Sequence, residues 1–234
     1  MRDLSTFKGC AAPQPVRLEG RFVVIEPYDR ATHLEALWEG LGGMEINPLL
    51  TYFTQPYFGS IADFDAWLAG VQKGGWVTEV FRDKATGKVV GMANYMRPDP
   101  ANGVVEIGGV AHGPDMSRTP LATEAHYLLA KHVFEDLGYR RYEWKCHNEN
   151  APSKASAIRY GFQFEGVFRQ HMLSKGKNRD TAWFSIIDGE WPLVSAAFTA
   201  WLAPENFDAE GRQKHRLEDL RAERAISYPA AGQA

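Results

Sequence analysis

The middle of this chain alternates strands and helices in an order that restricts the fold more than any other feature. A strand pattern from Gly103 to Ala111 leads through a polar loop into a helix that opens at Pro120. A half-buried strand from Arg141 to His147 then leads into a helix that opens at Asn150. Because a helix N-terminus offers unpaired N–H groups and a partial positive charge, two such helices facing one cleft would bind phosphate.

The flanking segments place this unit inside a larger sheet. Further strands are predicted over 16–27, 76–82, 88–96, 162–170 and 181–187, and further helices over 31–38, 61–71 and 191–202. The Gly-, Pro- and aromatic-rich segment from Gly40 to Ser60 is too irregular for a regular element and has the length of a binding loop or lid. At 234 residues the chain fits one mixed α/β (α+β) domain with a single core.

Charge and composition argue against several classes of protein. The 26 Lys and Arg against 29 Asp and Glu give a net charge of -3, so we expect neither nucleic acid nor membrane as a partner. No stretch approaches the roughly 18 apolar residues of a membrane span, and the first residues have no apolar signal region. Cys10 and Cys146 lie far apart, with no CxxC spacing and no paired His. We therefore expect a cytoplasmic protein without a metal.

Three short runs carry the most specific motifs. They read VEIGGVAHGP over 105–114, SRTPLATEA over 117–125 and NAPSKASAIRYGF over 150–162. Together they resemble the GNAT superfamily of N-acetyltransferases, specifically its ribosomal-protein (RimJ/RimL-like) branch, across about residues 17–187. The resemblance implies the acyl-CoA N-acyltransferase fold, in which helices flank a central, twisted, mostly antiparallel sheet.

The same resemblance implies a domain organisation and a co-substrate. Residues 16–189 would form the acetyltransferase domain, with an N-terminal arm over 1–15 and a C-terminal helical appendage over 190–234. Acetyl-CoA would be the co-substrate, with no metal. The residues that match the family's coenzyme-binding positions are Val110, Ala111, His112, Ser117, Arg118, Thr119, Leu121, Ala122, Thr123, Asn150, Ser153 and Lys154.

The phosphate-binding run departs from the family pattern. The usual Gln or Arg falls on Ser117, and the usual glycines fall on Arg118 and Pro120, which removes flexibility and one amide donor. Arg118 could compensate by placing its guanidinium on the phosphates. Capping alone would also explain a Ser, Asn or Pro at these helix starts.

Two residues are the candidates for proton transfer. Glu106 on the central strand is the candidate base for the amine, with His112 in reserve, and Ser153 is the candidate proton donor to the leaving thiolate. Neither cysteine lies in a nucleophile setting, so we expect direct attack of the amine in a ternary complex. A structural role for Glu106 is the alternative.

The acceptor stays open at this point. Tyr52, Phe53 and Tyr57 could line its pocket or only anchor their loop to the core. It would be a primary amine, either a protein N-terminus or a small molecule. A different class of function is a catalytically inactive CoA-sensing or protein-interaction module on the same fold. The apolar stripe of 191–202 needs a partner within the monomer or in a homodimer.

Overall fold

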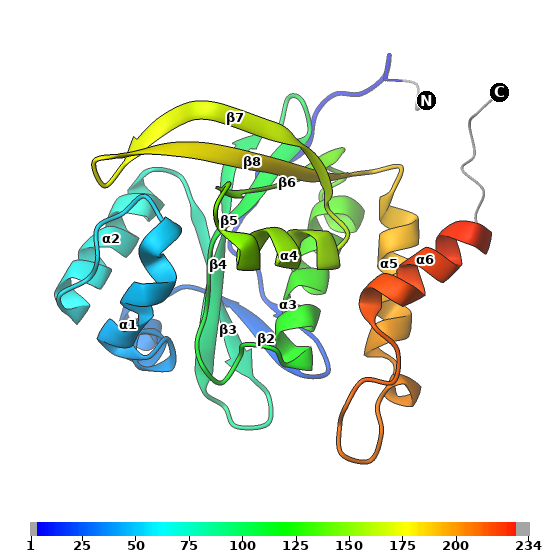
Figure 1. Cartoon of the computed structure of the whole chain (residues 1–234), viewed down its shortest axis with the longest axis horizontal. Helices are drawn as coiled ribbons and strands as arrows, with labels where there is room; N and C mark the ends of the chain where they lie inside the picture. The colour runs from blue at the N-terminus through cyan, green and yellow to red at the C-terminus, as the bar shows by residue number, and fades with distance from the viewer. Residues whose placement is uncertain (1–3, 228–234) are drawn as a thin grey trace.

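One twisted sheet forms the centre of the molecule, and each strand expected from the sequence belongs to it. The computed structural model describes residues 4–227. Its strands lie in the order β1-β2-β3-β4-β5-β6-β8-β7 (Figure 1). Their bounds are β1 Leu18–Glu19, β2 Val23–Pro27, β3 Val77–Asp83, β4 Val89–Asp99, β5 Val104–His112, β6 Arg141–His147, β7 Gln163–Ser174 and β8 Lys177–Ile187. The expected mixed α/β fold with a mostly antiparallel sheet is confirmed.

Among the described strands, neighbours run antiparallel except β5 and β6, which run parallel. A parallel pair needs a crossover connection, and helix α3 (Pro120–Lys131) supplies it. The start of α3 follows from sequence, because Pro120 occupies its first turn and Thr119 caps it. One π-helical turn, His132–Asp136, extends α3 toward β6.

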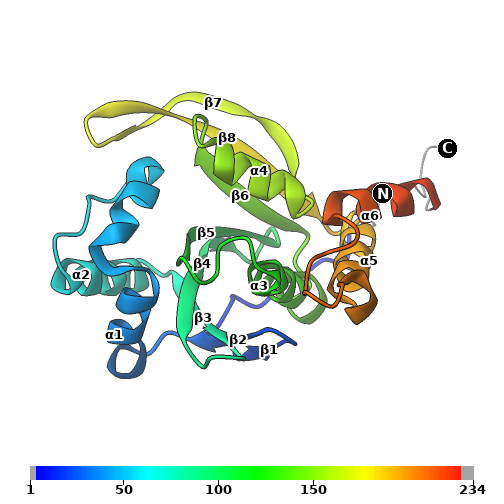
Figure 2. The same ribbon diagram turned by 60° about the horizontal axis from the view of Figure 1, so that its bottom comes forward.

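Helices cover both faces of the sheet and bury two hydrophobic clusters. On one face, α1, the 3₁₀ helix η1 and α2 share a cluster with Val80 and Met92. On the other face, side chains of α3, α4, α5 and α6 share the larger cluster, in which α5 packs on α3 (Figure 2). The helix bounds are α1 Arg30–Gly40, η1 Gly43–Tyr52, α2 Ile61–Lys73, α4 Ala151–Arg159, α5 Trp191–Leu202 and α6 Leu217–Ser227.

The apolar stripe of α5 finds its partner within the monomer. The Tyr127 and Phe198 rings stack at 5.3 Å between centroids, and Phe134 stacks on Trp191 at 4.9 Å. The residues predicted as an appendage thus share a core with α3. No helix in the described range 4–227 is long and apolar enough to cross a membrane.

Two segments are more regular than their sequence indicated. The segment expected to be an irregular loop contains η1, a 3₁₀ helix over Gly43–Tyr52. The polar segment between the last two strands continues both of them, and the hairpin turns at Lys175 and Gly176, with φ of 50° and 74°. These paired positive φ values are typical of a type I′ turn, which a polar-to-glycine step can form.

The carboxylate of Glu124 joins the start of α3 to the sheet. It accepts backbone N–H bonds from Arg21 at 2.7 Å, Phe22 at 2.6 Å and Val23 at 2.9 Å. Glu124 is only 4% exposed, so water is not available to replace these bonds. The three bonds hold the turn before β2 against the start of α3.

Replacing Glu124 should therefore destabilise the fold. Glu124→Ala leaves three N–H groups without their acceptor, and we expect the free energy of unfolding to fall by about 3 kcal/mol in urea titrations. Glu135→Ala on the same helical segment is a matched control that removes one bond, to the Trp191 indole, and should cost about 1 kcal/mol. Equal losses in the two variants would contradict the importance of the Glu124 bonds.

Candidate functional site

The pairing between β5 and β6 stops halfway along both strands. It runs from Val104 opposite Arg141 to Ile107 opposite Trp144, although β5 continues to His112. Beyond this point the two strands border a cavity of about 810 Å³. Its walls include Gly108 to His112 of β5, Lys145 to His147 of β6, the start of α4, residues of η1 and its following loop, and the β7–β8 hairpin.

A bulge in β5 turns the strand at this point. The register against β4 shifts between Met92 and Asn94, and Gly109 has φ of 55°, in the left-handed region. A side chain at Gly109 would place its Cβ 2.5 Å from Nδ2 of Asn94. The bulge changes the face of the sheet to which the residues after it point. Ile107, before the bulge, packs in the α3 cluster, whereas Ala111, after it, packs in the α1–α2 cluster.

Asn94 holds the bulge in place. Its Nδ2 donates to the carbonyls of Gly108 and Gly109, each at 3.3 Å, and its Oδ1 accepts from the Thr78 hydroxyl at 2.7 Å. Asn94 is fully buried. Since both carbonyls of the bulge are turned toward β4, the backbone on the β6 side stays available to a ligand.

Charged side chains pair on the face of the sheet that α1 and α2 cover. Oε2 of Glu106 contacts Arg97 at 2.5 Å and Lys145 at 3.0 Å. Lys145 also pairs with Glu143 at 2.7 Å and lies 3.8 Å from the centre of the Trp183 ring. Glu106 is 4% exposed, so these partners replace the water that the carboxylate loses.

Two histidines meet at the other end of the cavity. Nε2 of His112 lies 3.2 Å from Nε2 of His126, and the His126 ring stacks on Tyr160 at 4.4 Å. Burial lowers the pKa of His112 to about 4, and burial lowers the pKa of His126 well below its usual range. Both rings are therefore neutral at pH 7 and share one hydrogen between them.

Ser153 lies beside the only cysteine in the cavity wall. Its Oγ accepts from Nε1 of Trp144 at 3.0 Å, and the nearby hydroxyl acts on the Cys146 thiol in the direction that lowers its pKa. Burial raises the pKa of that thiol, which keeps Cys146 protonated and makes it a poor nucleophile. A hydroxyl already placed next to a sulfur suits Ser153 to act as a donor to one.

The N-terminus of α4 borders the cavity, whereas near α3 only Ser117, in the loop before the helix, lines it. Asn150 caps α4 by accepting from the N–H of Ser153 at 3.1 Å, and Thr119 caps α3. Before α3, the exposed Arg118 has φ of 63°. This is the left-handed backbone that glycine adopts most readily, and here an arginine occupies it.

The structure places the sequence-predicted residues in two groups. The cavity wall includes Glu106, Val110, Ala111, His112, Ser117, Asn150, Ser153, Tyr52 and Phe53. Outside it, Leu121 and Ala122 are buried in the core, Thr123 accepts from Arg159, Lys154 bonds Asn148, and Tyr57 contacts Lys175. Arg118 and Thr119 also lie outside the wall, on the loop before α3.

Sequence reasoning missed the charged wall of the cavity. Arg97, Lys145 and Arg179 line it, together with Trp183. A signal existed for Lys145, because the charged side chains of 141–147 alternate along a strand in the middle of the sheet, where they need ionic partners. Arg97 and Arg179 follow no such pattern. An irregularity in the β4–β5 pairing orients the side chain of Arg97, and the β7–β8 hairpin orients that of Arg179.

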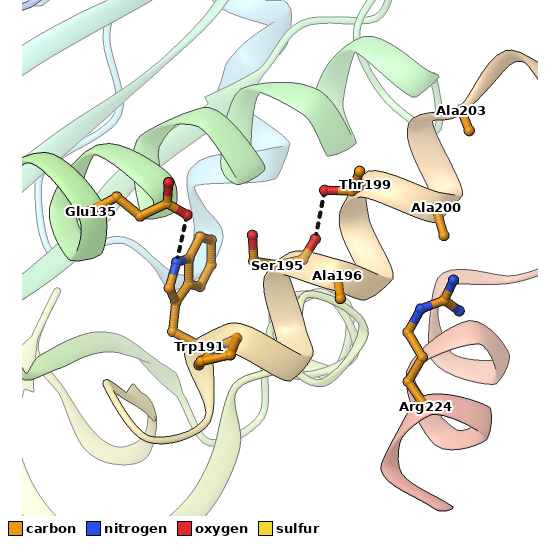
Figure 3. Close-up of a pocket in the computed structure, with 9 residues that line it drawn as sticks. Glu135, Trp191, Ser195, Ala196, Thr199, Ala200, Ala203 and Arg224 are labelled. Atoms are coloured by element: carbon orange, nitrogen blue, oxygen red, sulfur yellow. Dashed lines mark hydrogen bonds between the residues drawn. The ribbon is translucent and has the colours of Figure 1, made fainter. Parts of the chain in front are cut away.

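A second hollow, of about 630 Å³, lies along α5 and α6 (Figure 3). Small side chains such as Ser195, Ala196 and Thr199 form much of it, and Glu135 is bonded to Nε1 of Trp191. Its lining, within the described part of the chain, contains no pair of interacting side chains comparable to Glu106 with Lys145, or His112 with His126, at the cavity between β5 and β6. The described residues also contain no group of three or more His, Cys, Asp or Glu side chains able to hold a metal.

Comparisons with known proteins agree with this geometry. The family described as Acetyltransferase (GNAT) domain matches residues 23–163. A crystal structure of a GCN5-related N-acetyltransferase from Brucella melitensis is 46% identical, covers 94% of this chain and 100% of its own, and has a TM-score of 0.90. A probable GNAT-family acetyltransferase from Chromobacterium violaceum is 37% identical, with 82% and 96% coverage and a TM-score of 0.76.

A curated relative is similar over a shorter stretch. The uncharacterized N-acetyltransferase p20 of Bacillus licheniformis is 32% identical over 112 residues, which make up 46% of this chain. The match spans 60% of that relative's own length.

The buried histidine pair predicts a loss of stability in acid. Because folding lowers the pKa of His112 from 6.5 to about 4, its contribution is complete above pH 6.5 and is lost as the pH falls toward 4. In His112→Gln, the drop in unfolding free energy between about pH 7.5 and about pH 5 should be smaller than in the natural protein by about 2 kcal/mol.

Two features make this measurement interpretable. Burial raises the pKa of Glu79 to about 8, so the contribution of Glu79 to stability rises as the pH falls, opposite to that of His112. The informative quantity is therefore the difference in pH dependence between His112→Gln and the natural protein. His215→Gln, at an exposed site, is the control and should follow the natural protein. An identical pH dependence in His112→Gln would contradict the prediction.

Proposed function

Since the chain belongs to the GNAT acetyltransferase family, we propose that it transfers an acetyl group from acetyl-CoA to a primary amine. The observation that carries the proposal is the parting of β5 and β6 after Ile107 and Trp144. It opens a cavity in the middle of the sheet, where a backbone edge, the N-terminus of α4, the loop before α3 and paired charges meet. Acetyl-CoA would supply an acetyl group activated as a thioester.

The residues present fit the coenzyme. The free edge of β5 from Gly108 to Ala111 can pair with the amides of a pantetheine arm as another strand would. A Cβ at Gly109 would strike Asn94, so the edge requires a glycine where the chain bulges. The N-terminus of α3 offers N–H groups to a pyrophosphate, and Arg118 adds a positive charge beside it.

The chain's own groups have distinct roles in this proposal. The Ser153 hydroxyl accepts from Trp144, so its own hydrogen can go to the leaving sulfur. A backbone N–H on the free edge of β5 would stabilise the negative charge that develops on the carbonyl oxygen. The amine reaches the carbonyl directly, and no covalent enzyme intermediate forms.

Glu106 would receive the proton that the amine loses. Oε2 of Glu106 forms ion pairs with Arg97 and Lys145, and these cations disfavour protonation of that oxygen. Oε1 lies against Gly108, at the cavity wall, and is the atom suited to accept. The neutral His112 is hydrogen-bonded to His126, and burial lowers its pKa to about 4, so it is poorly suited to hold the proton.

The branch of the family and the acceptor belong to the same proposal. The run from Asn150 to Phe162 supports placement in the ribosomal-protein branch, whose acceptors are amines. A calorimetric titration with acetyl-CoA, followed by thiol-release assays on a panel of primary amines, tests the activity. Binding with turnover is expected; binding without turnover on any amine would instead favour a CoA-sensing module, and absence of binding would contradict both.

Arg118 allows coenzyme contact to be separated from backbone strain. A non-glycine residue in the left-handed region costs about 1–2 kcal/mol, which Arg118→Gly relieves and Arg118→Ala does not. Greater freedom of the unfolded chain offsets about 0.4–1 kcal/mol of that relief. We expect the Gly variant to be at least as stable as the natural protein in urea titrations.

Affinity should respond differently. Both variants lose the guanidinium, and calorimetry should show acetyl-CoA binding weakened about fivefold in each, since a contact to phosphate contributes about 1 kcal/mol at an exposed site. Added salt should narrow this difference from the natural protein. Unchanged affinity in both variants would show that Arg118 does not contact the phosphates.

A further inference from the structure

Unused hydrogen-bond donors surround the end of the cavity that lies away from α3. Nε2 of Gln55 and Nε1 of Trp183 are buried without a partner in the described structure, and both residues line the cavity. Each is a donor that cannot accept at that atom. Buried donors of this kind cost free energy unless a ligand supplies acceptors.

Arg179 adds a positive charge to this wall. Its guanidinium donates to the carbonyl of Tyr52 at 3.1 Å and to the Thr181 hydroxyl at 3.3 Å, both neutral oxygens. Among the described residues no carboxylate lies within ion-pairing distance of it, and its Nη2 donates no hydrogen bond. Burial lowers the pKa of Arg179, as expected of a cation without a partner.

The other charges of the cavity are already paired. Arg97 and Lys145 both contact Glu106, and Lys145 also contacts Glu143 behind the wall. Three cations against two carboxylates leave an excess of one positive charge, and Arg179 is the cation without a carboxylate. An anionic oxygen group would supply both the missing charge and acceptors for the unused donors.

We infer that the acceptor amine also carries an anionic oxygen group, a carboxylate or a phosphate, which Arg179 binds. The inference rests on the proposed acetyltransferase function and specifies its acceptor. The planar fork of an arginine matches such groups with two parallel hydrogen bonds. Gln55 and Trp183 donate to the same molecule along the wall.

The position of Arg179 favours a small acceptor. Arg179 lines the same cavity as Glu106 and Ser153, the two residues proposed to transfer protons. The anion and the amine therefore belong to neighbouring parts of one molecule. In a protein N-terminus the group next to the amine is a neutral amide, which would leave Arg179 without its counter-charge. An amino acid has the charges in the required arrangement.

Matched pairs of acceptors test the inference. The probes are free amino acids against their C-terminal amides, and phosphoethanolamine against ethanolamine, each assayed with acetyl-CoA by thiol release. We expect the natural protein to prefer at least one anionic member by about 30-fold in kcat/KM, mostly through KM. The two pairs distinguish a carboxylate from a phosphate.

Two variants of Arg179 separate its binding of the anion from its hydrogen bond to the carbonyl of Tyr52. Arg179→Gln keeps a donor for the Tyr52 carbonyl but loses the charge, and should reduce the preference to below about threefold; Arg179→Lys should retain part of it. His171→Gln, beside the same Thr181 hydroxyl, is the matched control and should keep the preference. Calorimetry should show unchanged acetyl-CoA affinity in all three.

Binding of products gives a readout that needs no turnover. The N-acetyl product of the preferred anionic acceptor should bind the natural protein more tightly than the N-acetyl product of its neutral partner, and Arg179→Gln should abolish the difference. Neutral and anionic members used equally well in both pairs, or a preference unchanged in Arg179→Gln, would overturn the inference while leaving the acetyltransferase proposal intact. Failure to bind acetyl-CoA would count against the proposed function instead.

Discussion

The place where β5 ceases to pair with β6 determines the rest of the site. A continuous ladder would fill the middle of the sheet with strand–strand hydrogen bonds and leave no room for a ligand. The left-handed Gly109 interrupts it, and the buried Asn94 fixes the bulge by binding two carbonyls at once. Thr78 in turn fixes Asn94, so three strands determine the geometry of one glycine.

The bulge also divides the cavity into regions of different chemistry. Before it, Glu106 faces the charged surface shared with Lys145 and Arg97. After it, His112 points to the α3 side and meets another neutral imidazole. A single residue inserted in β5 thus brings an ionic region and an uncharged region to the two ends of one cavity, which suits a reaction between a polar amine and a thioester.

The sequence predicted those parts of the structure that local patterns encode. Strand 141–147 and helix 191–202 have the bounds that their periodicity indicated, and both helix caps beside the cavity follow from Thr119 and Asn150. Periodicity carries no information about partners far apart in the chain. For this reason the bonds from Glu124 to the turn before β2, and the approach of Arg179 to Tyr52, could not be predicted. The coenzyme and catalytic roles remain predictions.

The β7–β8 hairpin reaches toward η1 (Figure 2) and is bonded to it. Lys175 donates to the carbonyl of Leu50 at 2.7 Å and Arg179 to that of Tyr52 at 3.1 Å, so the hairpin tip holds the last turn of η1. Residues of η1 and of the hairpin both line the cavity, so the length of the hairpin fixes how this part of the wall is held together. A hairpin shorter by one pair of residues would withdraw both bonds from η1.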